Sequence, residues 1–455
     1  MPKVGTLVFT LSTADSTSTT YDATITGLGD VTAFFYIQNC QDLDGTEHLE
    51  RYHVMGLGAI DSGGAFDCHS STARDIHNVT TQDSYRDLRY LGDNTIRMWH
   101  LGEYTVARIT DGIRLTKTGT ADASADREYQ IIFTVFSDCK AAVGSGTLPN
   151  STTTSITTNA SDGSGNIDCN VALFQSACQN ATNNGNNNIA LPSYGWGQRI
   201  TDSTFRQWGH CWHSQDGQTT MRMTSQFCDD NVLTQTSAGA ENWGAALTNW
   251  TANGSTSAIQ LTTNASTGAD YYCYLAFEDT VSAYVDYKTI ESASTSHTLT
   301  GSTTSGVSAK CLFVGGSTND TVNAVDTTTE ATGDFMAWIS DKSSGITEGS
   351  SYGISADGVG TSYCKSYNND SNGFIVKAYV GGETTRAVGT LEFDGQDATA
   401  TYTTTPPSAS YNVNYGYALF SDDWAGGGGS SRQVGLQDLS TGFIPSFSQI
   451  QVGLR

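Results

Sequence analysis

Charged side chains are scarce in this sequence, and basic ones are the scarcest. Only 15% of the 455 residues are charged, and 22 Lys and Arg stand against 46 Asp and Glu, which gives a formal net charge of −24. Nucleic acids and anionic membranes bind proteins through clustered Lys and Arg, so neither is an expected partner. Such acidity keeps a protein soluble and opposes non-specific self-association, and it suits docking onto a basic protein surface equally well.

Long apolar runs and paired cysteines are also missing. No segment approaches the ~18 consecutive apolar residues of a membrane span. Residues 1–3 lead directly into residues 4–11, which read as a strand, so we expect synthesis in the cytoplasm without a signal peptide. The ten Cys include no CxxC pair, which excludes zinc-ribbon and thioredoxin-type motifs. We expect buried thiols, with Cys169–Cys178 and Cys211–Cys228 as the alternative disulfides.

What the sequence does contain favours β-structure. Gly (48), Ser, Thr and Asn are abundant, Pro is rare (6), and aromatic residues make up 10% of the chain. Disordered chains are poor in aromatic residues, so this composition indicates packed cores beneath a neutral polar surface. Thr, Val, Ile, Tyr and Phe suit pleated, half-buried strands.

Three landmarks recur in the same order along the chain. The first is an apolar strand that follows a Ser/Thr/Gly-rich segment: VTAFFYIQ (31–38), CNVALFQ (169–175) and VSAKCLFVG (307–315). The second is a hairpin turn before an alternating strand: Asp111-Gly112, Asn253-Gly254 and Asp394-Gly395. Asp-Gly and Asn-Gly favour type I′ turns, because both central residues of such a turn need a positive φ. The third is an aromatic strand whose last residue is acidic: YQIIFTVFSD (129–138), YYCYLAFED (271–279) and YGYALFSDD (415–423).

The spacing of these landmarks predicts three tandem domains. The turn and the aromatic strand lie 18 residues apart in the first two copies (111 to 129, 253 to 271) and 21 apart in the third (394 to 415). We predict repeats at 1–145, 146–290 and 291–425, then a Gly/Ser linker and an apolar C-terminal arm at 426–455. The predicted fold is all-β, with three antiparallel, jelly-roll-like β-sandwiches of about eight strands each. Residues 72–90 are the best candidate for a short helix.

The start and end of each copy resemble a repeated module of tailed-bacteriophage structural proteins. In that module a Gly-Leu-Gly turn leads into an apolar strand, an Asp-Gly hairpin follows, and a strand similar to Tyr-Tyr-Leu-Ala-Leu closes the unit. Here Gly27-Leu28-Gly29 precedes residues 31–38, and residues 271–277 and 417–420 supply the close, whereas copy one closes with IIFTVF. The resemblance implies a component of a virion.

Two clusters offer ligands of the kind that metals use. His210 and His213 lie in WGHCWHSQD, but residues three apart on a strand point to opposite faces, so packed histidines are expected there. Asp42-Leu43-Asp44-Gly45 opens like a calcium loop whose later ligands are missing, so an Asx-type turn is expected. We therefore predict no metal site and no cofactor, with a structural Ca²⁺ ion at a surface loop as the alternative.

Catalytic constellations are weak in this sequence. Asp67-Cys68-His69 suggests a cysteine nucleophile, but adjacent residues of an extended chain diverge and no third group orients the histidine. The pairs Glu278-Asp279 and Asp422-Asp423 suggest the two acids of a glycoside hydrolase. Because they recur at one position of the repeat, strand-ending turns explain them more simply. We assign no catalytic residue and predict a protein that is not an enzyme.

The candidate binding residues are aromatic or apolar. Trp243, Trp250 and Trp424 lie near Gly-rich stretches, where indoles can stack on sugars or anchor interfaces, with a packing role as the alternative. In the predicted arm, Phe443, Ile444 and Phe447 are expected to dock on a neighbouring protein.

Together these features predict a non-enzymatic structural protein of a tailed-phage virion, as a capsid decoration or a tail component. Its expected partners are other virion proteins and further copies of itself, since repeated β-modules with sheet edges assemble side by side. The first alternative is a tail-fibre adhesin that binds a host-surface glycan or receptor. The second, less favoured, is a carbohydrate-active enzyme.

Overall fold

The computed structural model of the chain describes residues 2–424 apart from a series of short segments. Those segments are 39–49, 77–84, 91–92, 122–126, 149–151, 179–185, 188, 216–221, 238–239, 252–257, 265–269, 303, 319–320, 327–331, 343–344, 356–363, 370–372 and 380–382. Residues 425–455 are outside the description too, so Phe443, Ile444 and Phe447 of the predicted arm lie outside the described residues.

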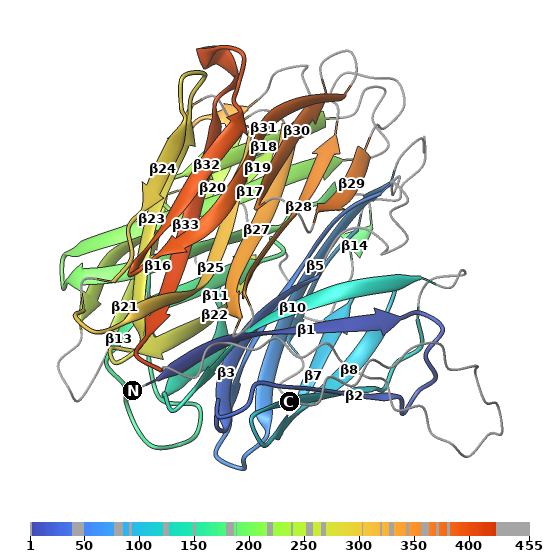
Figure 1. Cartoon of the computed structure of the whole chain (residues 1–455), viewed down its shortest axis with the longest axis vertical. Helices are drawn as coiled ribbons and strands as arrows, with labels where there is room; N and C mark the ends of the chain where they lie inside the picture. Colours follow the sequence, from blue (N-terminus) through green and yellow to red (C-terminus); the bar gives the residue numbers. More distant parts are fainter. Residues whose placement is uncertain are drawn as a thin grey trace.

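The described chain is all-β, as predicted, and it forms three antiparallel β-sandwiches in tandem (Figure 1). Each sandwich pairs a large sheet with a four-stranded small sheet. In repeat 1 the large sheet has the order β1 (Lys3–Ser12), β10 (Glu128–Ser137), β3 (Val31–Gln38), β4 (Glu50–Ile60), β5 (Phe66–Ile76), β6 (Tyr85–Tyr90), and the small sheet β2 (Thr20–Thr24), β9 (Gly112–Lys117), β8 (Gly102–Ile109), β7 (Thr95–Met98).

The other two repeats follow the same plan. Repeat 2 has the large-sheet order β11 (Ala141–Leu148), β22 (Asp270–Glu278), β13 (Cys169–Ser176), β16 (Ser193–Thr201), β17 (Thr204–Gln215), β18 (Arg222–Cys228), and the small-sheet order β12 (Thr153–Thr157), β21 (Ala258–Thr263), β20 (Ala240–Thr251), β19 (Leu233–Ser237). Repeat 3 has the large-sheet order β23 (Ser282–Ile290), β33 (Val413–Asp422), β25 (Ser308–Ser317), β27 (Thr332–Lys342), β28 (Gly345–Ser355), β29 (Cys364–Asn369), and the small-sheet order β24 (Ser296–Leu299), β32 (Asp397–Thr404), β31 (Glu383–Asp394), β30 (Phe374–Tyr379).

The strand plan places the starts of the repeats and corrects one local prediction. β11, which opens the second set of sheets, runs through the predicted boundary at 145/146, and β23 opens the third set ahead of 290/291. Where a helix was predicted at 72–90, residues 72–76 end β5 and residues 85–90 form β6, and residues 77–84 lie outside the described residues. β5 pairs with β4 and β6 on its two sides, and this ladder outweighs the weak helical pattern.

Two of the three predicted hairpins are observed, each with its turn displaced by one residue. Ile109 pairs with Gly112, so Thr110 and Asp111 form the first turn, and Asp111 has φ 61°. Asp394 pairs with Asp397, so the turn of the last hairpin begins at Gly395, which has φ 65°. Asn253-Gly254 lies outside the described residues.

The continuous apolar runs of the first landmark are strands buried on both faces. In β3, Phe34 and Tyr36 point into the core of their own sandwich, whereas Ala33, Phe35 and Ile37 point the other way into a second core. Side chains alternate along a strand, so a strand covered on both sides needs apolar residues at every position. β13 of repeat 2 and β25 of repeat 3 divide their side chains in the same way.

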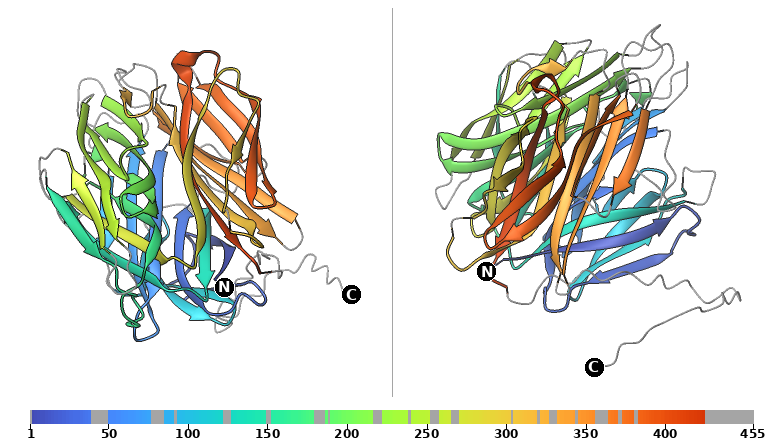
Figure 2. Two further views of the ribbon diagram at one scale, coloured as in Figure 1. Left: turned by 90° about the vertical axis from the view of Figure 1, so that its left-hand side faces the viewer. Right: turned by 45° about the horizontal axis from the view of Figure 1, so that its top comes forward.

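This second core, called the shared core below, joins the large sheets of all three repeats. It is built by β1, β3, β4 and β10, by β11, β13, β16, β17, β18 and β22, and by β23, β25, β27 and β33. In Figure 2 the second repeat (green) and the third (orange to red) lie side by side, with strands of the first (blue) between and below them. The chain is therefore one block, since its repeats bury their large sheets against one another.

Three equivalent phenylalanines meet inside the shared core. Phe136, Phe277 and Phe420 occupy the same place in the closing strands, and their ring centroids lie 4.4 Å (136–277), 5.0 Å (136–420) and 6.1 Å (277–420) apart. They are called the axial phenylalanines below. Mutual contact of three equivalent side chains marks an approximate threefold axis within a single chain.

The contacts between repeats run around this axis in one direction. The first strand of each repeat packs on strands of the repeat before it, namely β11 on β4 and β5, β23 on β16 and β17, and β1 on β25 and β27. The last of these contacts closes the ring from repeat 3 to repeat 1. A hydrogen bond supports this closure, because the Val4 N–H donates to Asp422 Oδ2 at 2.9 Å.

Short strands also link neighbouring repeats at their sheet edges. β14 (Asn186–Asn187) of repeat 2 pairs with β6 of repeat 1, and β26 (Val325–Asp326) of repeat 3 pairs with β18 of repeat 2. Each covers the edge of the preceding large sheet, which protects that edge from pairing with another chain. In the described part of the chain, no helix is long and apolar enough to cross a membrane.

Candidate functional site

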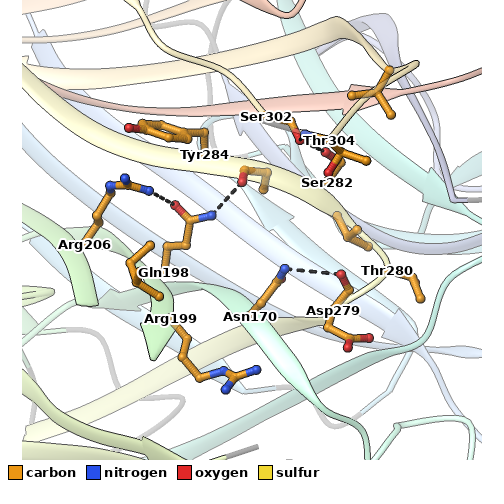
Figure 3. A pocket seen from close by; sticks show the side chains of 14 residues that line it. Asn170, Gln198, Arg199, Arg206, Asp279, Thr280, Ser282, Tyr284, Ser302 and Thr304 are labelled. Atoms are coloured by element: carbon orange, nitrogen blue, oxygen red, sulfur yellow. Dashed lines mark hydrogen bonds between the residues drawn. The ribbon is translucent and has the colours of Figure 1, made fainter. Parts of the chain in front are cut away.

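A groove of about 580 Å³ opens at the seam between repeats 2 and 3 (Figure 3). The end of β16 and the start of β17 form one wall, and the connection into β23 with the loop after β24 forms the other. It is lined by Asn170, Gln198, Arg199, Ile200, Arg206, Asp279, Thr280, Val281, Ser282, Ala283, Tyr284, Ser302, Thr304 and Val307. Its size falls in the range of small-molecule sites.

Gln198 fixes the two walls relative to each other. Its Nε2 donates to the Ala283 carbonyl at 2.6 Å, and its Oε1 accepts from the Val285 N–H at 3.0 Å. The buried amide of β16 thus completes the backbone hydrogen bonding of β23 in the next repeat. Both of its contacts replace hydrogen bonds to water, so they hold the seam in register.

Arg206 is positioned by both repeats. Its guanidinium carbon lies 4.0 Å from the ring centroid of Tyr284 in repeat 3, and its Nη1 donates to Gln198 Oε1 at 3.4 Å in repeat 2. Stacking uses the face of the guanidinium plane and leaves N–H donors along its edge. Within the described residues no carboxylate forms an ion pair with Arg206, whereas Arg199 is paired with Asp202 at 3.1 Å.

The opposite wall presents hydroxyl, amide and carboxylate groups beside apolar atoms. The Ser282 hydroxyl donates to Ser302 Oγ, and Asn170 Nδ2 donates to the Asp279 carbonyl at 3.3 Å. The side chain of Asp279 is exposed, as is that of Thr304. Ile200 lies at the rim with 45% of its surface exposed, and among the described residues it is the one large hydrophobic side chain that is exposed.

The same place in the first repeat carries the opposite charge. Counting across the sheet from the axial phenylalanine, repeat 2 runs from Phe277 through Val171 and Gln198 to Arg206. In repeat 1 the corresponding path ends at Asp67, and in repeat 3 it ends at Thr347. Burial and the charges of Asp61 and Asp93 raise the pKa of Asp67 to about 6. The arginine that lines the groove is therefore specific to repeat 2 and is not part of the common plan of the repeat.

Two of the three indoles predicted to bind ligands, Trp243 and Trp250, take the packing role instead. Trp243 is 3% exposed and Trp250 is fully buried, both in the core of sandwich 2, and Trp243 Nε1 donates to Asp270 Oδ2 at 2.6 Å. Their ring faces are covered, so they cannot stack on a sugar. Trp424 is half-buried against the core of sandwich 1, with Lys3 Nζ 5.5 Å from its ring centroid.

His210 and His213, the weak metal-ligand candidates that were expected to be packed histidines, lie on opposite faces of β17, as an extended strand requires. His210 is fully buried with its ring 5.4 Å from that of Tyr194, and His213 is 2% exposed. The described residues contain no group of three or more His, Cys, Asp and Glu suited to hold a metal ion. Asp42 and Asp44 lie outside the described residues.

The Asp67-Cys68-His69 segment does not form a nucleophile with its base. It lies in extended β5, where Cys68 faces the core of sandwich 1 and burial raises the pKa of its thiol well above the usual value. Burial lowers the pKa of His69 to about 3, so its 3.9 Å approach to Asp67 is a contact of a neutral ring. The eight cysteines whose side chains the structure describes are free and buried, so Cys169–Cys178 and Cys211–Cys228 are not disulfides.

The acidic pairs at the strand ends serve local backbone contacts. Glu278 Oε1 accepts from the Lys140 N–H at 2.7 Å, and Asp422 accepts from Val4 and from Trp424. Asp138, the matching acid of repeat 1, lies 3.4 Å from Lys3 Nζ. These carboxylates fix the turns and the ring closure at one end of the molecule.

Sequence reasoning did not find the groove, because its lining comes from two repeats. Arg199, Ile200 and Arg206 belong to the β16–β17 hairpin of repeat 2, whereas Ser282 lies on β23 and Ser302 and Thr304 lie in the loop after β24 of repeat 3. One signal was available in the sequence. Arg199 and Arg206, two of its 22 basic residues, stand at positions where the other two copies have no basic residue. No protein-family model matches the chain, and no curated protein matches it in sequence.

Proposed function

We propose that this chain is a non-enzymatic structural subunit that takes the place of a trimer in a larger particle, namely a tailed-phage virion. The observation that supports this proposal is the shared core, in which three sandwiches of one plan pack around the axial phenylalanines. A block of this kind presents three related outer faces, and closed oligomers with such symmetry are common building units of assemblies.

The fusion of three repeats into one chain lets each face differ. In a true trimer every seam is identical, whereas here the positions of Arg206, Asp67 and Thr347 carry three different side chains. A single-chain block can therefore sit on a threefold or quasi-threefold position and still contact different neighbours. A net charge of −24 suits docking onto a basic neighbour, either as a capsid decoration or as a tail component.

The test is the composition of purified particles. We expect the protein in density-banded virions at a fixed ratio to the major capsid or tail protein, measured by mass spectrometry after the particles are washed in high salt. A host protein added before banding is the control for carry-over. Absence of the protein from dissociated virions would overturn the proposal, and cryo-electron microscopy of intact particles would assign it to capsid or tail.

The second candidate function is a glycan-binding adhesin. Trp243 and Trp250 do not support this function, because both are buried, but the groove between repeats 2 and 3 does.

A further inference from the structure

We propose that the groove between repeats 2 and 3 binds an acidic sugar, with the guanidinium of Arg206 holding its carboxylate. This site goes beyond the proposed structural role, and it stands or falls independently of it. Three features support it: the position of Arg206, the polar and apolar groups around it, and the different side chain at the matching position of each repeat.

Arg206 has the geometry of a carboxylate clamp. Its face is occupied by Tyr284 at 4.0 Å and one donor reaches Gln198 Oε1, so its orientation is fixed before any ligand arrives. A planar guanidinium with a donor edge matches a carboxylate through two parallel hydrogen bonds. No carboxylate in the described part of the chain pairs with it, so a ligand would not have to displace an existing ion pair.

The remaining lining suits a sugar better than a peptide or a phosphate. The amide of Asn170, the carboxylate of Asp279 and the hydroxyl of Thr304 supply both donors and acceptors for ring hydroxyl groups. The exposed apolar side chain of Ile200 can cover the C–H face of a ring or an acetyl methyl group. A phosphate dianion or a polyanion carries more negative charge than a single carboxylate, so Asp279 and the net charge of −24 would repel it more strongly.

Comparison of the repeats separates this arrangement from the scaffold. The cross-sheet position of Arg206 is held by Asp67 in repeat 1, where the side chain lies near Asp61 and Asp93. All three repeats reach the same fold, so folding does not require an arginine there. The stacked, carboxylate-free guanidinium is particular to one seam and coincides with the groove.

Ligand-observed NMR and calorimetry with the full chain test the proposal. The probes are N-acetylneuraminic acid and D-glucuronic acid, with D-glucose and N-acetyl-D-glucosamine as neutral controls. We expect saturable binding of at least one acidic sugar and binding of the matched neutral sugar at least about tenfold weaker, since a charged hydrogen-bonded pair is lost.

Substitutions then assign the binding to the groove. Arg206→Gln should weaken binding by about 10- to 100-fold, whereas Arg114→Gln, an exposed arginine paired with Asp22 in repeat 1, should leave it unchanged. Ile200→Asp keeps the fold because this side chain is exposed, and it should weaken binding by placing a negative charge at the rim. Circular dichroism and melting temperature verify that each variant is folded.

Three results would overturn the proposal. They are equal affinity for acidic and neutral sugars, no saturable binding of either acid, and unchanged affinity in folded Arg206→Gln and Ile200→Asp proteins. Binding of a peptide through its terminal carboxylate in place of the sugars would likewise overturn it, because it would assign another ligand class to Arg206.

Discussion

At the scale of single residues, the axial phenylalanines concentrate the contacts between repeats. Each ring touches its two equivalents, so one substitution affects all three sandwiches at once. Phe136→Ala should lower the free energy of unfolding by about 3–5 kcal/mol, because a large buried ring is removed and the surrounding strands cannot collapse onto the cavity.

Urea unfolding followed by tryptophan fluorescence measures this loss. Ile200→Ala is the control, because an exposed side chain should change stability by less than about 0.5 kcal/mol. A loss below about 1 kcal/mol for Phe136→Ala would contradict the assignment of the shared core.

Also at the scale of single residues, Asp67 should make the stability of the protein depend on pH. Asp61 and Asp93 accept backbone N–H hydrogen bonds, while Oδ1 of Asp67 is buried without a hydrogen-bond partner. The folded pKa of about 6 lies above the ordinary value of 3.8, so the folded state binds more protons than the unfolded state between these pH values. The contribution of Asp67 to the stability of the protein therefore falls as the pH rises through this range.

Asp67→Asn removes the charge, so it should raise the melting temperature at pH 7.5 and have little effect at pH 4. The exposed Asp30, paired with Arg108, is the control, and Asp30→Asn should show no such gain at pH 7.5. Scanning calorimetry at the two pH values checks both variants. An equal effect of Asp67→Asn at both pH values would refute the argument.

At the scale of elements, one carboxylate ties the hairpin of β8 and β9 to the turn before β3. Asp111 Oδ2 accepts from the Gly27 N–H at 3.0 Å, and Oδ1 accepts from the Gly29 N–H at 2.8 Å. Both glycines have positive φ (80° and 87°), so the turn depends on residues without a Cβ. Two landmarks of the repeat are therefore in physical contact.

Asp111→Ala should lower the melting temperature at neutral pH, because two N–H groups lose their acceptor. These hydrogen bonds lower the pKa of Asp111, so its contribution is present above about pH 4 and is lost as pH falls through the folded pKa. The matched control is Asp394→Ala at the corresponding hairpin of repeat 3, where Asp397 holds the Gly301 N–H instead. Equal melting temperatures for the two variants would exclude the tie.

At the scale of the whole molecule, no repeat is complete without the other two. The large sheet of each repeat has an apolar outer face, as Ala33, Phe35 and Ile37 of β3 illustrate. Residues 1–139 expressed alone should therefore aggregate or self-associate, whereas the full chain should contain one cooperative block. Light scattering after size exclusion checks this, and a soluble monomer of residues 1–139 with native near-UV circular dichroism would contradict it.

The sequence by itself determined the all-β fold and its repetition. Both follow from local physics, since alternating side chains, turn residues and doubly apolar strands such as residues 31–38 mark sandwiches wherever they occur. It also placed His210 and His213 on opposite faces, because that requires only the alternation of a strand.

Only the tertiary structure decided what the second apolar face packs against, and thus that three sandwiches share a core. It also decided that Trp243 and Trp250 are buried, since burial depends on the facing sheet and not on neighbours in sequence. The groove at Arg206 arises where β17 of one repeat meets β23 of the next. Such a seam brings together residues that are distant along the chain, so no local sequence pattern predicts the groove.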